Sequence, residues 1–305
     1  MINDFQKISK RINDPIIKKI DILNKNDKSI IHFLKSIIEI RKLLLSKGFN
    51  KKEINTILKN FTKIFLFKKF IIKNKGIETL IEKNNVPQEI IDELETYLKI
   101  DKEKVKDEIF RQDNIKPRRK SKLDLWIRYF FLKKVKKYLR GVYGYKVHAR
   151  YASNDGKLKS SKRFQYSFSN MHWDFALNAM PFVIYLSDVK KGQGEFKVLN
   201  HPKNFKQNLY LSFYDYLISE NVGISKSLMS NRVGSHLEFK DKKDIENNIT
   251  YFDGPKGTSI FFAGRYILHC GGYPDLNQTR LSIFLSHKNV YMAILNYLLN
   301  IFFIF

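Results

Sequence analysis

The first part of the chain carries apolar residues at the three- and four-residue spacing of helices that pack against a core. Ile, Leu and Phe recur in this way between residues 30 and 40 and again between residues 55 and 70. Residues 87–89 (Pro-Gln-Glu) place a proline and an acid where a first helical turn favours them. Residues 123–139 are a further apolar stretch, rich in aromatic side chains. The pattern therefore predicts helices before Gly141.

After Gly141 the pattern changes to short runs rich in β-branched and aromatic residues. Clusters of Gly, Asn, Asp and Lys separate these runs and favour turns. The expected strands are residues 142–151, 164–168, 180–186, 209–213, 258–262, 266–270 and 280–286. Strands in this number can close two small sheets over each other. We predict an α+β protein whose C-terminal part is a double-stranded β-helix, a jelly roll or cupin-like barrel, preceded by a helical region.

Three regions follow from this change of pattern. Residues 1–115 form a helical N-terminal region of unknown role, and residues 116–289 form the barrel domain with a leading helix. The basic run at residues 116–122 could pass for a nuclear localisation signal, but we interpret it as the boundary between these regions. Residues 290–305 are nearly all apolar and predict an amphipathic C-terminal helix. We favour internal packing of this helix over a peripheral membrane contact or a dimer interface.

The chain is strongly basic, with 56 Lys or Arg against 30 Asp or Glu and a formal net charge of +26. Such a charge could serve a nucleic-acid or anionic membrane surface. Only twelve of the basic residues are arginine, whose planar fork makes the specific contacts with phosphates and bases. We therefore favour a coding bias toward lysine and expect no nucleic-acid partner. The single cysteine, Cys270, and the polar N-terminus without a signal peptide indicate a cytoplasmic protein.

His172 and Asp174 are the first candidates for chemistry, because residues two apart on a strand point to the same face. A further histidine from a distant strand, such as His269, would complete a face of two imidazoles and one carboxylate. This face holds non-haem Fe(II) and leaves coordination positions open. The residue types and their spacing therefore predict a metal site.

Arg280 follows His269 by eleven residues, and turn-forming Gly, Pro, Asp and Asn lie between them. A symmetric hairpin would place Arg280 opposite His269, with Ser282 on the same face and opposite Ile267. A guanidinium in that position can hold a carboxylate by a bidentate pair. The spacing alone does not name the anion.

Four segments resemble, in order, the Fe(II)/2-oxoglutarate-dependent oxygenases, and most closely their phytanoyl-CoA hydroxylase-like branch. These segments are residues 171–174, residues 183–189 leading to Gly194, residues 257–264 leading to His269, and residues 280–282. The resemblance implies Fe(II) at His172, Asp174 and His269, and 2-oxoglutarate with its distal carboxylate on Arg280 and Ser282. It further implies that O2 is consumed, that an unactivated C–H of a small-molecule or lipid-like substrate is hydroxylated, and that succinate and CO2 are co-products. Related halogenases lack the carboxylate, so the presence of Asp174 points to hydroxylation.

The chain departs from this family in two loops. Gly194 is followed by Glu195-Phe196 where the family more often has Pro and Leu, and residues 199–202 (Leu-Asn-His-Pro) replace the usual Pro-Gly-Ser-His turn. Both departures lie in loops around the predicted site. They bear on the substrate more than on the metal.

Several alternatives stay open at this point. His236 and Glu238 form a second imidazole–carboxylate pair at strand spacing and could hold a metal together with His269. His172 and His269 could instead be hydrogen-bonded histidines of an iron-free barrel. The protein would then be a catalytically silent binding protein or a membrane-associated one. An oxygenase acting on nucleic acid is a third possibility, and neither the substrate nor the oligomeric state follows from the sequence.

Overall fold

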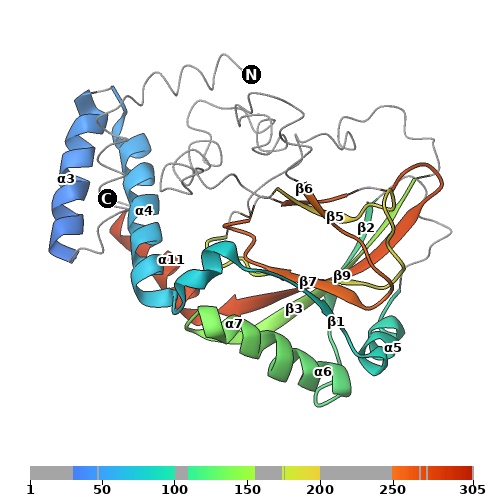
Figure 1. Cartoon of the computed structure of the whole chain (residues 1–305). Helices are drawn as coiled ribbons and strands as arrows, with labels where there is room; N and C mark the ends of the chain where they lie inside the picture. Colours follow the sequence, from blue (N-terminus) through green and yellow to red (C-terminus); the bar gives the residue numbers. More distant parts are fainter. Residues whose placement is uncertain are drawn as a thin grey trace. The chain divides into compact units, whose positions relative to one another are not determined.

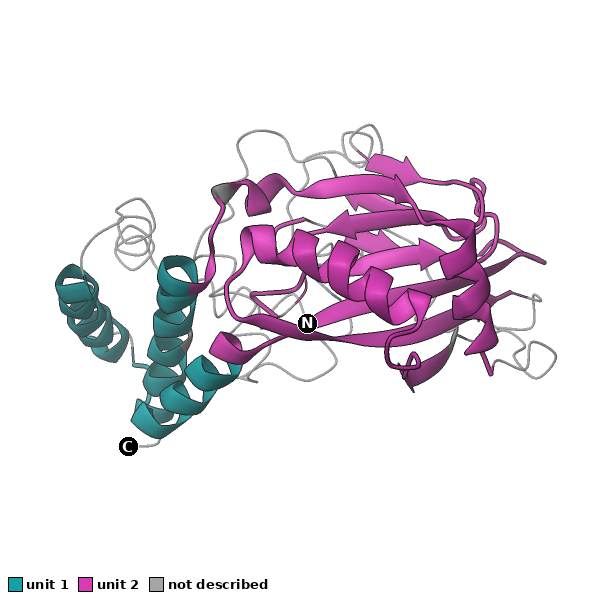
Figure 2. Cartoon of the chain, turned by 90° about the horizontal axis from the view of Figure 1, so that it is seen from below, with its two compact units in different colours: residues 1–70, 204–231, 293–305 teal, residues 71–203, 232–292 magenta. Residues whose placement is uncertain are grey.

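The computed structural model describes residues 30–46, 48–99, 109–154, 174, 176–199, 249–267, 269–272 and 274–303. The chain divides into two compact units (Figure 2). Unit 1 comprises residues 1–70, 204–231 and 293–305, and unit 2 comprises residues 71–203 and 232–292. The predicted site residues that the structure describes all belong to unit 2.

Unit 1 is helical in its described part. It contains α3 (Ile30–Ser46), α4 (Lys51–Leu66), all but the last residue of the π-helical turn η1 (Phe67–Ile71) and most of α11 (Val290–Phe302). Asn50 and Glu53 form a capping box at the start of α4, in which each side chain accepts the other residue's backbone N–H, at 2.9 and 2.8 Å. Phe33 of α3 stacks on Phe65 of α4 with 4.0 Å between ring centroids. The predicted apolar spacing thus becomes the contact between these two helices.

The C-terminal segment forms the predicted helix, α11. Its Leu295 and Leu299 are buried, whereas Tyr297 and Phe302 are exposed. Among the helices in the described part of the chain, none is both long enough and apolar enough to cross a membrane.

Unit 2 is built on two antiparallel sheets that face each other (Figure 1). The large sheet has the strand order β1-β7-β4-β9-β3-β2 and the small sheet the order β6-β5-β8. The strands are β1 (Ile81–Asn85), β2 (Ile109–Ile115), β3 (Val142–Ser153), β4 (Phe182–Tyr185), β5 (Phe196–Leu199), β6 (Ile249–Phe252), β7 (Thr258–Phe262), β8 (His269–Gly271) and β9 (Thr279–Asn289). The mixture of helices and antiparallel sheets confirms the predicted α+β class.

Four strands match predicted ranges, namely β3, β4, β7 and β9, and β8 is shorter than predicted. The predicted strands at residues 164–168 and 209–213 lie outside the described residues. Strands β1 and β2 fall within residues 1–115, so the prediction that this whole range is helical is wrong. The units divide after residue 70, and residue 115 lies inside unit 2. The domain limits given above remain a prediction.

The two sheets enclose the core of unit 2. Residues from both sheets meet there, including Val183, Tyr185, Ile260 and Phe262 of the large sheet and Phe196 and Val198 of the small one. Neighbouring residues along a strand point to opposite faces, so Phe182 and Phe261 lie on the outer face of the large sheet. Their rings contact Phe131 at centroid distances of 5.8 and 6.2 Å. The cover on both faces explains why every residue of β4 and β7 is buried.

The outer face of the large sheet is covered by the helix predicted at residues 123–139 (Figure 2). The helix runs through α6 (Lys122–Trp126), the π-helical turn η3 (Ile127–Phe131) and α7 (Leu132–Tyr138). Trp126 contacts Phe182 edge-on at 5.8 Å, and Phe131 is fully buried. Trp126 and Phe131 thus pack on the sheet. The basic charge of the segment alone would have been compatible with a nucleic-acid or lipid surface. Unit 2 also contains the 3-10 turn η2 (Lys75–Thr79) and α5 (Gln88–Thr96), which begins after Pro87 as expected.

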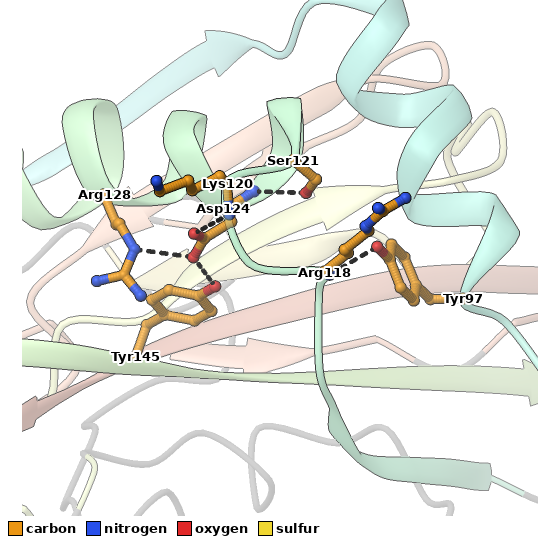
Figure 3. Close-up of polar contacts among 7 residues, drawn as sticks. All are labelled: Tyr97, Arg118, Lys120, Ser121, Asp124, Arg128 and Tyr145. Carbon is orange, nitrogen blue, oxygen red and sulfur yellow. Dashed lines mark hydrogen bonds and ion pairs between the residues drawn. The ribbon is translucent and has the colours of Figure 1, made fainter.

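A buried carboxylate, Asp124, joins the start of this helix to strand β3 (Figure 3). It accepts hydrogen bonds from the Tyr145 hydroxyl at 2.5 Å, from Arg128 Nε at 2.8 Å and from the Lys120 backbone N–H at 3.0 Å. The Ser121 hydroxyl accepts the Asp124 N–H at 3.2 Å and caps the helix. Burial alone would raise the pKa of Asp124, but the hydrogen bonds from Tyr145, Lys120 and Arg128 hold it below its usual value.

We expect Asp124→Asn to lower the free energy of unfolding by about 2 kcal/mol at neutral pH. The carboxylate has a lower pKa when folded, so its contribution is complete above the unfolded-state pKa of about 3.9 and is lost as the pH falls through the folded-state pKa. Urea unfolding of both proteins from neutral to acidic pH measures the difference. The exposed Asp92→Asn is the matched control and should change little. A deficit for Asp124→Asn that persists unchanged in acid would contradict this explanation.

Candidate metal centre

Two of the three predicted metal ligands lie together in the structure. Asp174 precedes β4, and His269 is the first residue of β8 in the small sheet. Asp174 Oδ1 and His269 Nε2 are 3.8 Å apart, and His269 is buried. His172 lies outside the described residues, as do His236 and Glu238 of the alternative site. Within the described ranges, no group of three His, Cys, Asp or Glu residues gathers at metal-binding distances.

The hydrogen bond of the His269 ring determines which nitrogen faces Asp174. Nδ1 lies 2.8 Å from the Ile267 carbonyl oxygen, which can only accept, so we assign the proton to Nδ1. A neutral ring presents the lone pair of Nε2 toward the Asp174 carboxylate, whereas a protonated ring forms an ion pair with it at 3.8 Å. Two acceptors facing each other repel unless a proton or a cation lies between them. A backbone carbonyl that fixes the ring tautomer is also how many metal-bound histidines are held.

The backbone around Asp174 is attached to the turn between β7 and β8. The Asp174 N–H donates to the Gly264 carbonyl at 2.8 Å, and the Gly264 N–H donates to the Ala179 carbonyl at 2.9 Å. Arg265 Nη1 donates to the Asp174 carbonyl at 3.3 Å. A Cβ on Gly264 would lie 1.8 Å from Asp174 Oδ2, so the carboxylate occupies the space of the missing side chain. Gly264 ends one of the family-like segments, but its contact with the candidate metal centre was not predicted from the sequence.

Aromatic rings surround the His269 imidazole. Phe262 of β7 lies edge-on to it at 4.6 Å between ring centroids, and Phe196 of β5 lies at 5.6 Å. Both phenylalanines are buried. An imidazole in such apolar surroundings is shielded from water, which strengthens its electrostatic interactions.

Arg280 faces the core, but the predicted hairpin with His269 is wrong. β8 pairs with β5 in the small sheet, whereas β9, which carries Arg280, pairs with β3 and β4 in the large sheet. The turn at residues 272–278 therefore carries the chain from one sheet to the other. Arg280 is 7% exposed, its Nη1 donates to the Gly194 carbonyl, and its Nη2 would lie 3.5 Å from a Cβ on Gly271. The Arg280 side chain therefore crosses the core between the two sheets. Its guanidinium reaches Gly271, which is two residues from His269 on β8.

Ser282 also lies elsewhere than predicted. It pairs with Arg150 of β3 and Tyr185 of β4, and not with Ile267. Its side chain is fully buried, and its hydroxyl lies 3.5 Å from the Arg150 carbonyl oxygen. Because it is two residues from Arg280 on one strand, it points to the same face of the sheet. Arg280 and Ser282 therefore share one face of β9, as predicted, but the residues opposite them are not the predicted His269 and Ile267.

Cys270 next to His269 is buried, as predicted. Burial raises the pKa of its thiol to about 11, so the side chain is protonated near neutral pH. Neighbouring residues of a strand point to opposite faces, so Cys270 points away from the face that carries the His269 imidazole. Cys270 is a small residue of the core.

No family model matches the chain, and no curated protein matches it either. Distant likenesses to solved structures exist. A prolyl-4-hydroxylase from Pseudomonas putida is 9% identical, over 75% of this chain and 98% of that chain, with a TM-score of 0.35. HygX from Streptomyces hygroscopicus with iron bound is 11% identical, over 70% of this chain and 82% of that chain, with a TM-score of 0.36.

A further structure of HygX contains nickel, 2-oxoglutarate and hygromycin B. The Kdo hydroxylase KdoO, a non-heme Fe(II) alphaketoglutarate dependent dioxygenase, is 15% identical over 72% of this chain and 82% of that chain, with a TM-score of 0.31. Likenesses with identities and TM-scores this low do not establish a shared fold or activity. The case for a function comes from the residues of the site.

Proposed function

We propose that this protein is a non-haem Fe(II)- and 2-oxoglutarate-dependent dioxygenase with a double-stranded β-helix fold. The observation that carries the proposal is the pair of Asp174 and His269, whose Oδ1 and Nε2 atoms lie 3.8 Å apart. Carboxylate oxygen and neutral imidazole nitrogen are ligands that suit Fe(II). His172 would supply the third ligand from two residues before Asp174. The segments at residues 257–264 and 280–282 favour the phytanoyl-CoA hydroxylase-like branch of these enzymes.

The residues around this pair would each have a defined task. Asp174 and His269 would hold the metal, and the hydrogen bond between His269 Nδ1 and the Ile267 carbonyl fixes the ring for that purpose. Phe196 and Phe262 exclude water from the imidazole. Exclusion of water from an active site limits side reactions during an oxidation.

Arg280 would bind the distal carboxylate of 2-oxoglutarate, with Ser282 on the same face of β9 as a further hydrogen-bond donor. The guanidinium is buried and comes from the sheet opposite to the one that carries His269. Charge-assisted bidentate pairs of this kind are strong where water is excluded. Bound iron with 2-oxoglutarate and O2 would supply the oxidation that hydroxylates an unactivated C–H of a small-molecule or lipid-like substrate, giving succinate and CO2.

We expect His269→Ala to weaken Mn(II) binding by at least about 100-fold, because the imidazole is a direct ligand and even its supporting contacts commonly contribute 10- to 100-fold. Calorimetric titration with Mn(II), a redox-silent substitute, measures this without an identified substrate. Formation of succinate from 2-oxoglutarate with Fe(II) should be lost in the same variant. The matched control is His32→Ala, which removes an exposed histidine on α3 and should change neither result. Wild-type Mn(II) affinity in His269→Ala would contradict the proposal.

A further inference from the structure

The helix that covers the outer face of the large sheet has a cationic solvent face. Residues 116–140, which comprise the loop before α6 and the helix itself, contain eleven Lys or Arg and a single acid, Asp124. Asp124 is buried, and its carboxylate is engaged by Tyr145 and Arg128. No acid of this segment therefore faces solvent.

Acids of neighbouring elements neutralise only part of this charge. Glu89 of α5 pairs with Lys122 at 2.7 Å, and Glu82 of β1 pairs with Lys134. Three other lysines of α7 are exposed and form no ion pair within the described part of the chain, namely Lys133, Lys136 and Lys137.

Lys73 adds a fourth cation at the C-terminal end of α7. Its Nζ donates to the Lys136 carbonyl oxygen at 3.1 Å, and its side chain is exposed. Residues three and four apart on a helix are neighbours, so Lys133 lies one turn from Lys136 and Lys137. We call these four residues, Lys73, Lys133, Lys136 and Lys137, the lysine cluster.

The loop before α6 presents further cations from a fixed backbone (Figure 3). The Tyr97 hydroxyl accepts the Arg118 N–H at 2.8 Å, and the Asp124 carboxylate accepts the Lys120 N–H at 3.0 Å. Lys120 has a φ of 62°, a left-handed conformation that is uncommon for lysine. Both contacts are made by backbone groups, and the side chains of Arg118 and Lys120 are exposed. The positions of these cations are thus set before any ligand binds.

The stability of the helix does not explain the cations of the loop. A helix N-terminus carries a partial positive charge, so cations are unfavourable there and favourable at the C-terminus. Lys136 and Lys137 lie in the last turn of α7, where they are favourable. Arg118 and Lys120 precede the first turn of α6, where they oppose the helix dipole. A bound anion would compensate this charge.

A coding bias toward lysine does not explain this segment either. Four of the twelve arginines of the chain lie within residues 116–140. The low arginine content of the whole chain argued against a nucleic-acid partner, but it does not describe this segment. Tyr129 is 72% exposed and lies between the loop and the lysine cluster along the helix. Cations interleaved with an exposed aromatic ring are typical of surfaces that bind single-stranded nucleic acid.

A membrane fits this surface less well than a strand of nucleic acid. Helices that lie on a membrane bury a broad apolar face in the lipid. The apolar face of this helix is occupied, because Trp126 and Phe131 pack on the large sheet. From Lys122 to Tyr138 the helix is about 25 Å long, at about 1.5 Å per residue. Cations at both ends of such a rod match a linear polyanion.

We propose that this surface binds single-stranded nucleic acid. The cations of the loop and the lysine cluster contact phosphates at the two ends of the helix, and a base stacks on Tyr129 between them. Binding is independent of base sequence, because phosphates and the face of a base carry little sequence information. The surface lies on the outer face of the large sheet, so the inference does not depend on the proposed oxygenase activity.

Fluorescence anisotropy of the full-length protein with a labelled oligothymidylate of about 16 nucleotides tests the proposal. Lys133→Gln combined with Lys137→Gln should weaken binding about tenfold at about 0.1 M salt. It should also reduce the slope of log K against log salt concentration by about 1.4, at about 0.7 per lost phosphate contact. The matched control is Lys190→Gln combined with Lys191→Gln, which removes two exposed charges outside this surface and should retain the wild-type affinity and slope.

Tyr129 provides an independent measurement of base stacking. Tyr129→Ala should weaken binding of oligothymidylate about tenfold, whereas Tyr129→Phe keeps the ring and should bind as the wild type does. An abasic oligomer of the same length should bind Tyr129→Ala and the wild type equally. Thermal unfolding verifies that each variant is folded.

Three outcomes would overturn the inference. An equal loss of affinity in the lysine variant and in its control would mean that binding follows only from the net charge of the chain. Wild-type affinity in Tyr129→Ala would show that no base stacks there. Binding to vesicles of phosphatidylcholine and phosphatidylserine, without binding to oligothymidylate, would assign the surface to an anionic membrane.

Discussion

Gly264→Ala is expected to remove metal binding while the fold persists. The added Cβ would lie 1.8 Å from Asp174 Oδ2, so the carboxylate would have to leave its place beside His269. Loss of this ligand should weaken Mn(II) binding by at least about 100-fold, because even the loss of a contact that only supports a ligand commonly weakens metal binding 10- to 100-fold. Calorimetry with Mn(II) measures the affinity, and thermal unfolding verifies that the protein is folded. The φ angle of Gly264 lies outside the left-handed region, so alanine is compatible with the backbone there.

Gly144→Ala is the matched control for this experiment. It makes the same chemical change in β3, where the new Cβ would meet only the flexible Lys288 side chain at 3.5 Å. Its Mn(II) affinity should equal that of the wild type. If Gly264→Ala also bound Mn(II) normally, Asp174 would not be a ligand in the position described.

Arg280→Met should weaken 2-oxoglutarate binding by about 3 kcal/mol, on the order of 100-fold in Kd, since a buried charge would lose its partner. Mn(II) affinity in the absence of 2-oxoglutarate should stay near that of the wild type, because Arg280 is not a proposed metal ligand. Arg280→Lys should recover only part of the loss, as lysine keeps the charge but not the bidentate fork. Calorimetric titration of the Mn(II)-loaded proteins with 2-oxoglutarate separates these results.

Arg119→Met removes a positive charge at an exposed position, so it is the control and should bind 2-oxoglutarate normally. An unchanged 2-oxoglutarate affinity in Arg280→Met, with Mn(II) bound, would show that the distal carboxylate lies elsewhere. A parallel loss of Mn(II) affinity would instead point to a structural effect through the Gly194 carbonyl that Arg280 contacts.

Patterns within short stretches of sequence predicted those features of the candidate site that depend only on neighbouring residues. Apolar runs located β7, which lies over Thr258–Phe262 as expected, and the choice of residue types singled out Asp174 and His269. The turn after His269 was also identified correctly as a turn. Its residues show where a chain reverses, but not whether the two strands remain in one sheet. Whether β8 and β9 share a sheet depends on their pairing with other strands. β8 pairs with β5 and β9 pairs with β3, and both of these strands lie far away in the sequence.

Other features left no readable signal in the sequence. β1, with the sequence Ile-Glu-Lys-Asn-Asn, has a single apolar residue and is held by backbone pairing with β7. Strand preferences depend strongly on such neighbours. Gly264 resembles any glycine that ends a strand, and its importance comes from a carboxylate ninety residues earlier in the chain. The pairing of Ser282 with Arg150 likewise depends on the register of β9 against β3, which no local pattern reveals.

The positions of β1 and β2 at the two edges of the large sheet have a consequence for biosynthesis. β1 is made early, yet its partner β7 emerges from the ribosome only after most of the polypeptide has been translated. Contacts between residues so distant in sequence slow folding and prolong the exposure of unpaired strands. The nascent protein therefore carries an unmatched edge through much of its synthesis, a period in which chaperones would limit aggregation.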